Sequence, residues 1–159
     1  MPSMKILLIA GGWSSEREVS LTGARGMQEA LLKRGHAVTF FYLLENFDEL
    51  LETARQHDFA LINLHGSPGE DGLVQAMLEK AGCPYQGSGP SGSFLALNKA
   101  AAKQIFRMAG LPTADWEFLP VRPAEGWEPR LPWPLFVKTT TGGSSLRLGD
   151  RKSTRLNSS

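Results

Sequence analysis

Residues that could do chemistry first gather in the segment Gly11–Ser20, directly after the apolar run Lys5–Ala10. Its two glycines allow a sharp turn and a close approach of the backbone to a ligand. Ser15 and Glu18 have the spacing of a capping box at a helix start, and Glu16 lies between them. A phosphate site at a helix N-terminus normally has no additional carboxylates. The acidic side chains therefore indicate either helix capping alone or a cationic or zwitterionic ligand.

A second segment of this kind, His65–Gly72, follows the apolar run Phe59–Leu64. In an open α/β sheet, loops at the carboxyl ends of neighbouring strands face one crevice, where ligands bind. His65 could bind a substrate carboxylate there or change its charge near neutral pH. Glu70 and Asp71 are expected to cap the helix that follows, because acids favour its first turn. Neither segment has the spacing of a dinucleotide fingerprint or a Walker A loop.

A third group of residues could hold phosphate. Lys138 ends the apolar segment Leu135–Lys138, where a lysine can bind phosphate oxygens as a point charge. The glycine and serine residues that follow offer backbone N–H groups and hydroxyls to the same anion. They include Gly143, Ser144 and Ser145. Lys99 taken alone is more simply a solvated lysine, but Lys138 in this setting predicts a nucleotide site.

The elements that must position these residues alternate between strand and helix. Strands are predicted at Lys5–Ala10, Ala37–Leu43 and Phe59–Leu64, and helices at Val19–Lys33, Phe47–Gln56 and Gly72–Ala81. This order predicts an α/β fold with a Rossmann-like parallel sheet and right-handed crossovers.

The glycine-rich stretch Pro84–Gly92 indicates a hinge, so a first domain is expected over residues 1–90 and a second from residue 91. In the second domain the pattern predicts one helix from about Phe94 to Ala109. It then predicts a strand over Thr113–Leu119, a proline-rich loop, and a strand over Leu135–Lys138.

Bulk composition excludes some classes of function. The 159 residues are 42% apolar and 21% charged, with a net charge of +1, which does not favour nucleic-acid binding through a basic face. Cys83 is the only cysteine, so no intrachain disulfide can form. The first apolar run is too short for a signal peptide or a membrane span. A cytoplasmic protein without membrane association is expected.

The last ten residues, Asp150–Ser159, are polar and lack any periodicity. They match the translation of a common sequencing adapter, so we interpret residues 150–159 as an adapter-derived tail. A natural polar tail is the alternative. On the adapter interpretation, the second domain, residues 91–149, is truncated.

Taken together, these segments resemble the D-alanine–D-alanine ligases of the ATP-grasp superfamily. The matching pieces occur in family order over residues 4–149. They are Gly11-Gly-x-Ser-x-Glu16, His65-Gly-x-x-Gly-Glu-Asp-Gly72, Pro84-Tyr-x-Gly-Ser-Gly89, Lys99, and Phe136-Val-Lys138 with Gly143-Ser-Ser145. The resemblance implies a Rossmann-like substrate-binding domain followed by an incomplete ATP-grasp central subdomain.

The resemblance also implies a reaction, the ligation of two D-alanines through an acyl phosphate for peptidoglycan precursor synthesis. Glu16 would pair with the ammonium of the first D-alanine, Val19 would line its methyl pocket, and His65 would lie near its carboxylate. Lys99 and Lys138 would contact the ATP phosphates. Gly143, Ser144 and Ser145 would close over those phosphates, and Ser144 would share a hydrogen-bond network with Glu16 as a catalytic residue.

Two Mg²⁺ ions would bridge the ATP phosphates, and the full-length protein would be a homodimer. Thr139 stands where the family often has proline, and Arg147 where it often has a small residue. The family's third domain, which supplies the magnesium ligands and an oxyanion-stabilising arginine, is missing, so this chain alone is expected to be inactive. Two alternatives stay open. One is a stand-alone Rossmann-like module that binds a small ligand, and the other is part of a ligase that joins D-alanine to D-lactate or D-serine.

Overall fold

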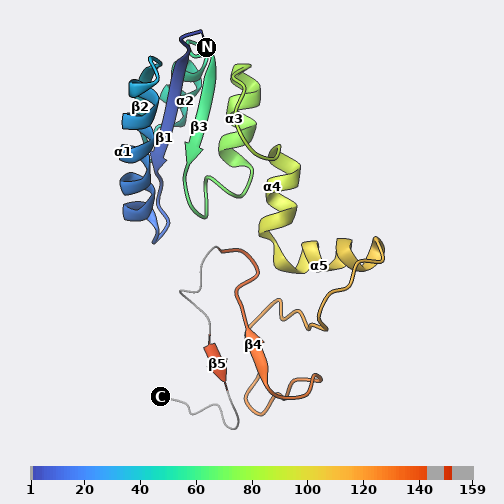
Figure 1. Cartoon of the computed structure of the whole chain (residues 1–159). Coiled ribbons are helices and arrows are strands. Elements are labelled where there is room, and N and C mark those ends of the chain that lie inside the picture. Colours follow the sequence, from blue (N-terminus) through green and yellow to red (C-terminus); the bar gives the residue numbers. More distant parts are fainter. Residues whose placement is uncertain (1, 143–148, 152–159) are drawn as a thin grey trace. The chain divides into compact units, whose positions relative to one another are not determined.

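The computed structural model of the chain describes residues 2–142 and 149–151 (Figure 1). The chain forms two compact units, of which the first ends at Leu97 and the second begins at Asn98. The loops after the first and third predicted strands lie in the first unit, and the predicted phosphate-binding lysines lie in the second.

The first unit is built on a three-stranded parallel sheet. Its strands are β1 (Lys5–Gly11), β2 (Ala37–Leu43) and β3 (Phe59–Asn63), in the order β2-β1-β3. The central strand β1 is a run of apolar residues because helices cover the sheet on both faces. Ala10 pairs with Tyr42 on one side and with Asn63 on the other, so the three strands end at the same edge (Figure 1).

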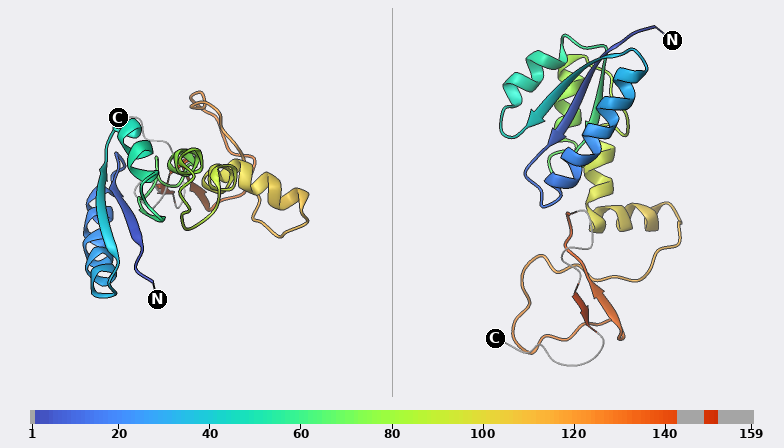
Figure 2. Two further views of the ribbon diagram at one scale, coloured as in Figure 1. Left: turned by 90° about the horizontal axis from the view of Figure 1, so that it is seen from above. Right: turned by 60° about the vertical axis from the view of Figure 1, so that its left-hand side comes forward.

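Successive side chains of β1 point to opposite faces and meet different helices. Leu8 and Ala10 pack with Ala24 of α1 (Arg17–Lys33). Leu7 and Ile9 pack on the other face with residues of α2 (Phe47–Ala54) and α3 (Leu73–Ala81). Figure 2 shows α1 and α2 on opposite sides of the sheet. The predicted strand and helix order of this unit is confirmed.

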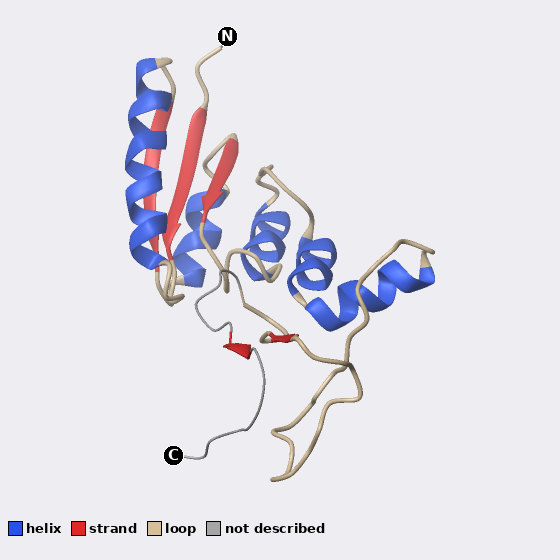
Figure 3. Cartoon of the chain, turned by 60° about the horizontal axis from the view of Figure 1, so that its bottom comes forward, coloured by secondary structure: helices blue, strands red, loops and turns tan. Residues whose placement is uncertain are grey.

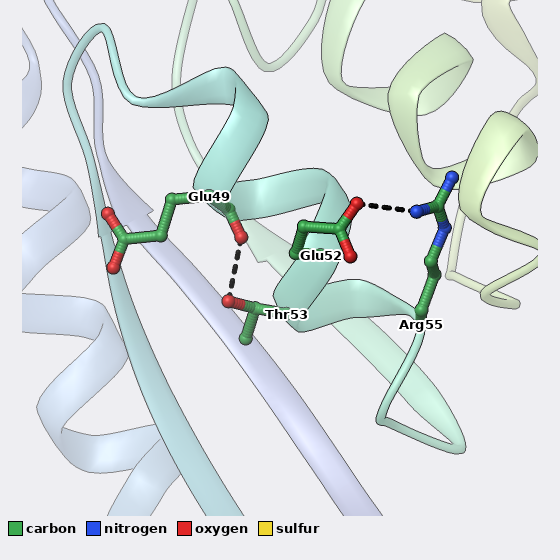
Figure 4. A network of polar contacts seen from close by, with 4 residues as sticks. All are labelled: Glu49, Glu52, Thr53 and Arg55. Carbon is green, nitrogen blue, oxygen red and sulfur yellow. Dashed lines mark hydrogen bonds and ion pairs between the residues drawn. The ribbon is translucent and has the colours of Figure 1, made fainter.

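Helix α2 combines a buried face with an exposed polar one. Glu52 and Arg55 form an ion pair of 2.5 Å, and Thr53 Oγ1 donates to the carbonyl of Glu49 at 2.7 Å (Figure 4). Exposed pairs of this kind contribute about 0–1 kcal/mol. The helix is therefore held mainly by Leu50 and Ala54, which are buried against the sheet.

The glycine-rich stretch after α3 covers the free edge of β3. Ala60 N donates to the carbonyl of Pro84 at 2.8 Å, and the side-chain amide of Gln86 bonds both the N–H and the carbonyl of Ile62, at 3.0 and 2.7 Å. Helix α4 (Pro90–Leu97) then packs against α3. The first unit consequently runs to Leu97, seven residues past the boundary predicted from the glycines.

The single helix predicted from Phe94 to Ala109 is wrong. The chain leaves the helical conformation at Asn98, which has φ −80° and ψ 100°, and α5 (Lys99–Met108) begins after it. Asn98 Oδ1 accepts a hydrogen bond from Ala101 N at 3.1 Å, so Asn98 caps the new helix.

The strand predicted at Thr113–Leu119 is also wrong, because these residues are loop (Figure 3). Lys103 Nζ instead holds this segment, bonding Thr113 Oγ1 at 3.0 Å and the carbonyl of Ala114 at 2.8 Å. Strand β4 (Leu135–Val137) pairs antiparallel with β5 (Gly149–Arg151). β5 therefore includes the first two residues of the predicted tail, and residues 152–159 lie outside the described part. No helix in the described part of the chain is long and apolar enough to cross a bilayer.

Candidate functional site

The first loop, Gly11–Glu16, turns away from the sheet on two glycines. Gly11 has φ +103° and Gly12 has φ +78°, and Gly12 N donates to the carbonyl of Leu43 at 2.8 Å. A Cβ built on Gly11 would lie 2.8 Å from a ring carbon of Tyr42. Both the positive φ and the packing of this ring therefore require glycine at position 11.

The start of α1 differs from the predicted capping box. The helix begins at Arg17 with Glu16 at the N-cap position, and no side chain accepts a capping hydrogen bond. Ser14 Oγ, one residue before the predicted Ser15, accepts from Glu16 N at 3.2 Å and shapes the turn. The capping-box prediction for Ser15 and Glu18 is therefore wrong.

The acids of the second loop have structural partners. Glu70 Oε2 accepts from Gly66 N at 3.0 Å and closes the loop on itself. Asp71 Oδ1 accepts from Leu73 N, the first residue of α3, at 3.0 Å, and its other oxygen accepts from Ser67 Oγ at 2.5 Å. Asp71 thus stabilises the helix start as predicted, whereas Glu70 stabilises the loop.

The two loops touch each other at the carboxyl edge of the sheet. A Cβ built on Gly66 would lie 3.3 Å from Ser14 Cβ, and one built on Gly12 would lie 3.4 Å from both Leu64 and Pro68. The contact follows from β1 and β3 being neighbours in the sheet. The segments that carry Glu16 and His65 therefore meet, as the strand order predicted.

The candidate side chains of this edge differ in exposure. Glu16 and His65 are half-buried, and Val19 on the first turns of α1 is 60% exposed. A carboxylate, an imidazole and an apolar side chain at one edge could accommodate a small zwitterion with an apolar substituent.

A hollow of about 600 Å³ lies beside the first loop, with walls from Trp13, Tyr42, Leu44, Glu45 and Asn46. The Arg17 guanidinium lies 5.1 Å from the centre of the Tyr42 ring, and Trp13 meets Phe47 edge to face at 5.9 Å. The contact of Tyr42 with this loop could not be predicted from the sequence. Tyr42 lies 31 positions from Gly11, and no local pattern indicates that the two residues meet.

Two groups in the first unit have raised pKa values, and both belong to the segment after α3. Burial, and then the nearby Asp58 carboxylate, raises the pKa of the Cys83 thiol. Burial, with a hydrogen bond to Glu79, raises the pKa of Tyr85. Both shifts arise outside the two loops.

In the second unit, the chain after β4 lies against the start of α5. Lys99 N donates to the carbonyl of Thr140 at 2.9 Å, and Lys99 Nζ donates to the carbonyl of Gly142 at 2.8 Å. Lys138 is exposed, four residues before Gly142. The structure thus brings Lys99 to the segment that follows Lys138.

The remaining phosphate-loop residues, Gly143, Ser144 and Ser145, lie outside the described residues. Within residues 2–142 and 149–151, no group of three or more His, Cys, Asp or Glu side chains could hold a metal ion. The described residues therefore supply cationic and backbone groups for an anion but no carboxylate cluster for Mg²⁺.

The chain was compared with family models, with curated proteins and with solved structures. No family model matches the chain. A curated protein of Desulfovibrio desulfuricans named D-alanine–D-alanine ligase is 77% identical over 146 residues, which are 92% of this chain and 48% of that protein. The crystal structure of D-alanine–D-alanine ligase from Bacillus anthracis is 37% identical with a TM-score of 0.78, covering 92% of this chain and 49% of its own.

A second structure of the Bacillus anthracis protein, complexed with ATP, is 39% identical with a TM-score of 0.67 and covers 74% of this chain and 38% of its own. The chain spans about half the length of the curated relatives it matches. Sequence and fold together show that the chain is related to the D-alanine–D-alanine ligases of the ATP-grasp superfamily and corresponds to about half of their length.

Proposed function

We propose that this chain is part of an ATP-dependent D-alanine–D-alanine ligase, in which the first unit binds the first D-alanine and the second unit contributes to phosphate binding. The observation that carries the proposal is the contact between the loops after β1 and β3, at Gly66 and Ser14, in a chain 77% identical to a protein of that name. That contact supports a shared crevice for Glu16 and His65.

The charges of a D-alanine zwitterion match the side chains at this edge. The Glu16 carboxylate, half-buried at the start of α1, would pair with the substrate ammonium. His65 would face the substrate carboxylate, and Val19 would line the pocket for the methyl group. Small apolar pockets discriminate weakly between similar substituents, so the ammonium pairing would provide most of the orientation.

For the phosphates, Lys99 and Lys138 would act as point charges. A lysine ammonium has three N–H donors, and Lys99 directs one of them to the carbonyl of Gly142, so donors remain for phosphate oxygens. Gly143, Ser144 and Ser145 would add backbone and hydroxyl donors. ATP, when bound, would supply the phosphoryl group that activates the substrate carboxylate for attack by the amine of a second D-alanine, which releases phosphate.

We propose that Mg²⁺ neutralises the phosphate charge in the whole ligase, with ligands from outside the described residues. Metal and oxyanion groups supply large electrostatic contributions to catalysis, and this chain spans about half the length of its curated relatives, so we propose that turnover requires the remaining half of the ligase. By resemblance, we also propose that the whole ligase is a cytoplasmic homodimer.

A chimera tests the proposal. Residues 1–149 of this chain are joined to the part of the Desulfovibrio desulfuricans relative that follows the matched segment, and phosphate release is measured with ATP and D-alanine. The chimera should be active, and Glu16→Gln should raise the KM for D-alanine. Glu18→Gln, also in the first turn of α1, is the matched control and should be nearly neutral.

Three outcomes would contradict the proposal. A chimera that is inactive on D-alanine, while the intact relative is active, would refute it. Activity only with D-lactate or D-serine as the second substrate would replace it with a different ligase specificity. Tight binding of D-alanine or ATP by the 159-residue chain without any turnover by the chimera would favour a stand-alone binding module.

A further inference from the structure

A buried hydrogen-bond network joins α1 to the ends of β1 and β3. Ser20, wholly buried in α1, is its centre. Its Oγ accepts from Gly11 N at 2.9 Å and donates to the carbonyl of Asn63. Asn63, only 9% exposed, returns a bond from Nδ2 to the carbonyl of Ser20 at 2.6 Å.

The network lies close to both Glu16 and His65, the residues proposed to bind the charged groups of the substrate. Ser20 N donates to the carbonyl of Glu16 at 3.0 Å, so Ser20 is one helical turn after Glu16. Asn63 ends β3, two residues before His65. Gly11 is the first residue of the loop that leads to Glu16. Any sliding of α1 along the sheet would break these directional bonds and change the separation of Glu16 and His65.

Glycine at position 23 leaves room for the network. A Cβ built on Gly23 would lie 3.0 Å from Asn63 Nδ2. A Cβ built on Gly26, in the same helix, would meet nothing within 4 Å. Glycine inside a helix is unfavourable relative to alanine by about 1 kcal/mol. Close packing of Asn63 explains why the helix has glycine at position 23.

We propose that Ser20 and Asn63 are positioning residues for the first-D-alanine site, fixing the start of α1 against the loop after β3. This inference rests on the proposed function. Hydrophobic packing of α1 through Ala24 holds the helix on the sheet but is not directional. The paired hydrogen bonds set its register, and a polar group buried without its partner is costly.

The test compares Gly23→Ala with Gly26→Ala in the 159-residue chain by amide hydrogen exchange. Both changes improve helix propensity equally, so they differ mainly in the contact with Asn63. Gly23→Ala displaces Asn63 Nδ2 and should raise exchange of the amides in loops 11–16 and 64–70, by up to about tenfold, the effect of losing one buried hydrogen bond entirely. Gly26→Ala should leave these amides unchanged. Equal exchange in the two variants would overturn the proposal.

A second pair of variants separates positioning from general stability. Ser20→Ala removes the centre of the network, whereas Leu78→Ala removes a buried contact on the other face of the sheet. A merely structural role predicts a similar rise in exchange throughout the unit for both. The proposal predicts that Ser20→Ala raises exchange in the two loops more than in the core of β1, and that Leu78→Ala does not.

Titration with D-alanine, followed by NMR shifts of the Glu16 and His65 amides, completes the test. The unchanged chain should show shifts at millimolar D-alanine, and Gly23→Ala should require more ligand than Gly26→Ala, because a displaced Asn63 changes the placement of the two loops. Absence of shifts in the unchanged chain would count against the proposed substrate site, while the exchange comparison would still decide whether the network fixes the loops. Equal titrations of Gly23→Ala and Gly26→Ala would overturn the positioning role.

Discussion

Two glycines at the ends of α3 offer a matched test of how the second loop is held. Gly72 precedes the helix with φ +91°, and Gly82 follows it with φ +73°. An alanine at either position occupies the left-handed region, at a cost of about 1–2 kcal/mol. The surroundings differ, since a Cβ on Gly72 would lie 2.3 Å from the carbonyl oxygen of Pro90, whereas one on Gly82 would meet nothing within 4 Å.

The clash at Gly72 involves backbone, so it cannot be relieved by rotating a side chain. Overpacking of this kind typically adds about 1–3 kcal/mol. We therefore expect Gly82→Ala to lower the free energy of unfolding by about 1 kcal/mol and Gly72→Ala by about 3 kcal/mol.

Urea unfolding followed by far-UV circular dichroism measures both variants. Gly72→Ala should also raise exchange of the amides at the start of α4, since Pro90 is its first residue. Equal destabilisation by the two alanines would refute the argument, because it would show that the contact between Gly72 and Pro90 does not constrain the loop.

Three further predictions follow from burial and charge. Leu50→Ala should lower the free energy of unfolding by about 3 kcal/mol in urea, because the side chain is wholly buried between α2 and the sheet. In the chimera, Lys99→Met should raise the KM for ATP by about tenfold or more, whereas Lys103→Met, whose ammonium holds the loop after α5, should change it little. The raised pKa of Cys83, due to burial and then Asp58, means that the folded state retains the thiol proton longer than the unfolded state. Its contribution to stability is therefore complete below the unfolded thiol pKa of about 8.5 and is lost as pH rises towards the raised value. Unfolding midpoints between neutral pH and pH of about 10 should fall less in Cys83→Ala than in the unchanged chain.

The first unit was predictable because its signals are local and strong. The apolar run of β1 and the spacing of apolar residues in α1, α2 and α3 identify each element. Topology rules then place the loops after β1 and β3 at one edge, and the contact of Gly66 with Ser14 agrees. The approach of the Glu16 and His65 segments could thus be predicted without any knowledge of side-chain contacts.

The incorrect helix and strand predictions arose where side-chain contacts, and not the local residue pattern, determine the backbone conformation. Asn98 interrupts a segment of good helix formers because its side chain caps the next helix, a choice that composition alone does not reveal. The segment at Thr113 lacks a strand partner and is bound by Lys103 instead. The bond between Ser20 and Asn63 joins residues 43 positions apart, and no pattern within either segment indicates it.

The two loops both place acids at a helix start, yet the structure gives those acids different roles. Glu70 and Asp71 accept hydrogen bonds from N–H and O–H groups of their own loop and of α3. Replacing either acid should therefore loosen the loop. Glu16 stands at the N-cap of α1 without making a capping hydrogen bond, and the turn before it is shaped by Ser14. The pairing of the Glu16 carboxylate with a substrate ammonium stays a prediction, which the comparison of Glu16→Gln with Glu18→Gln in the chimera tests.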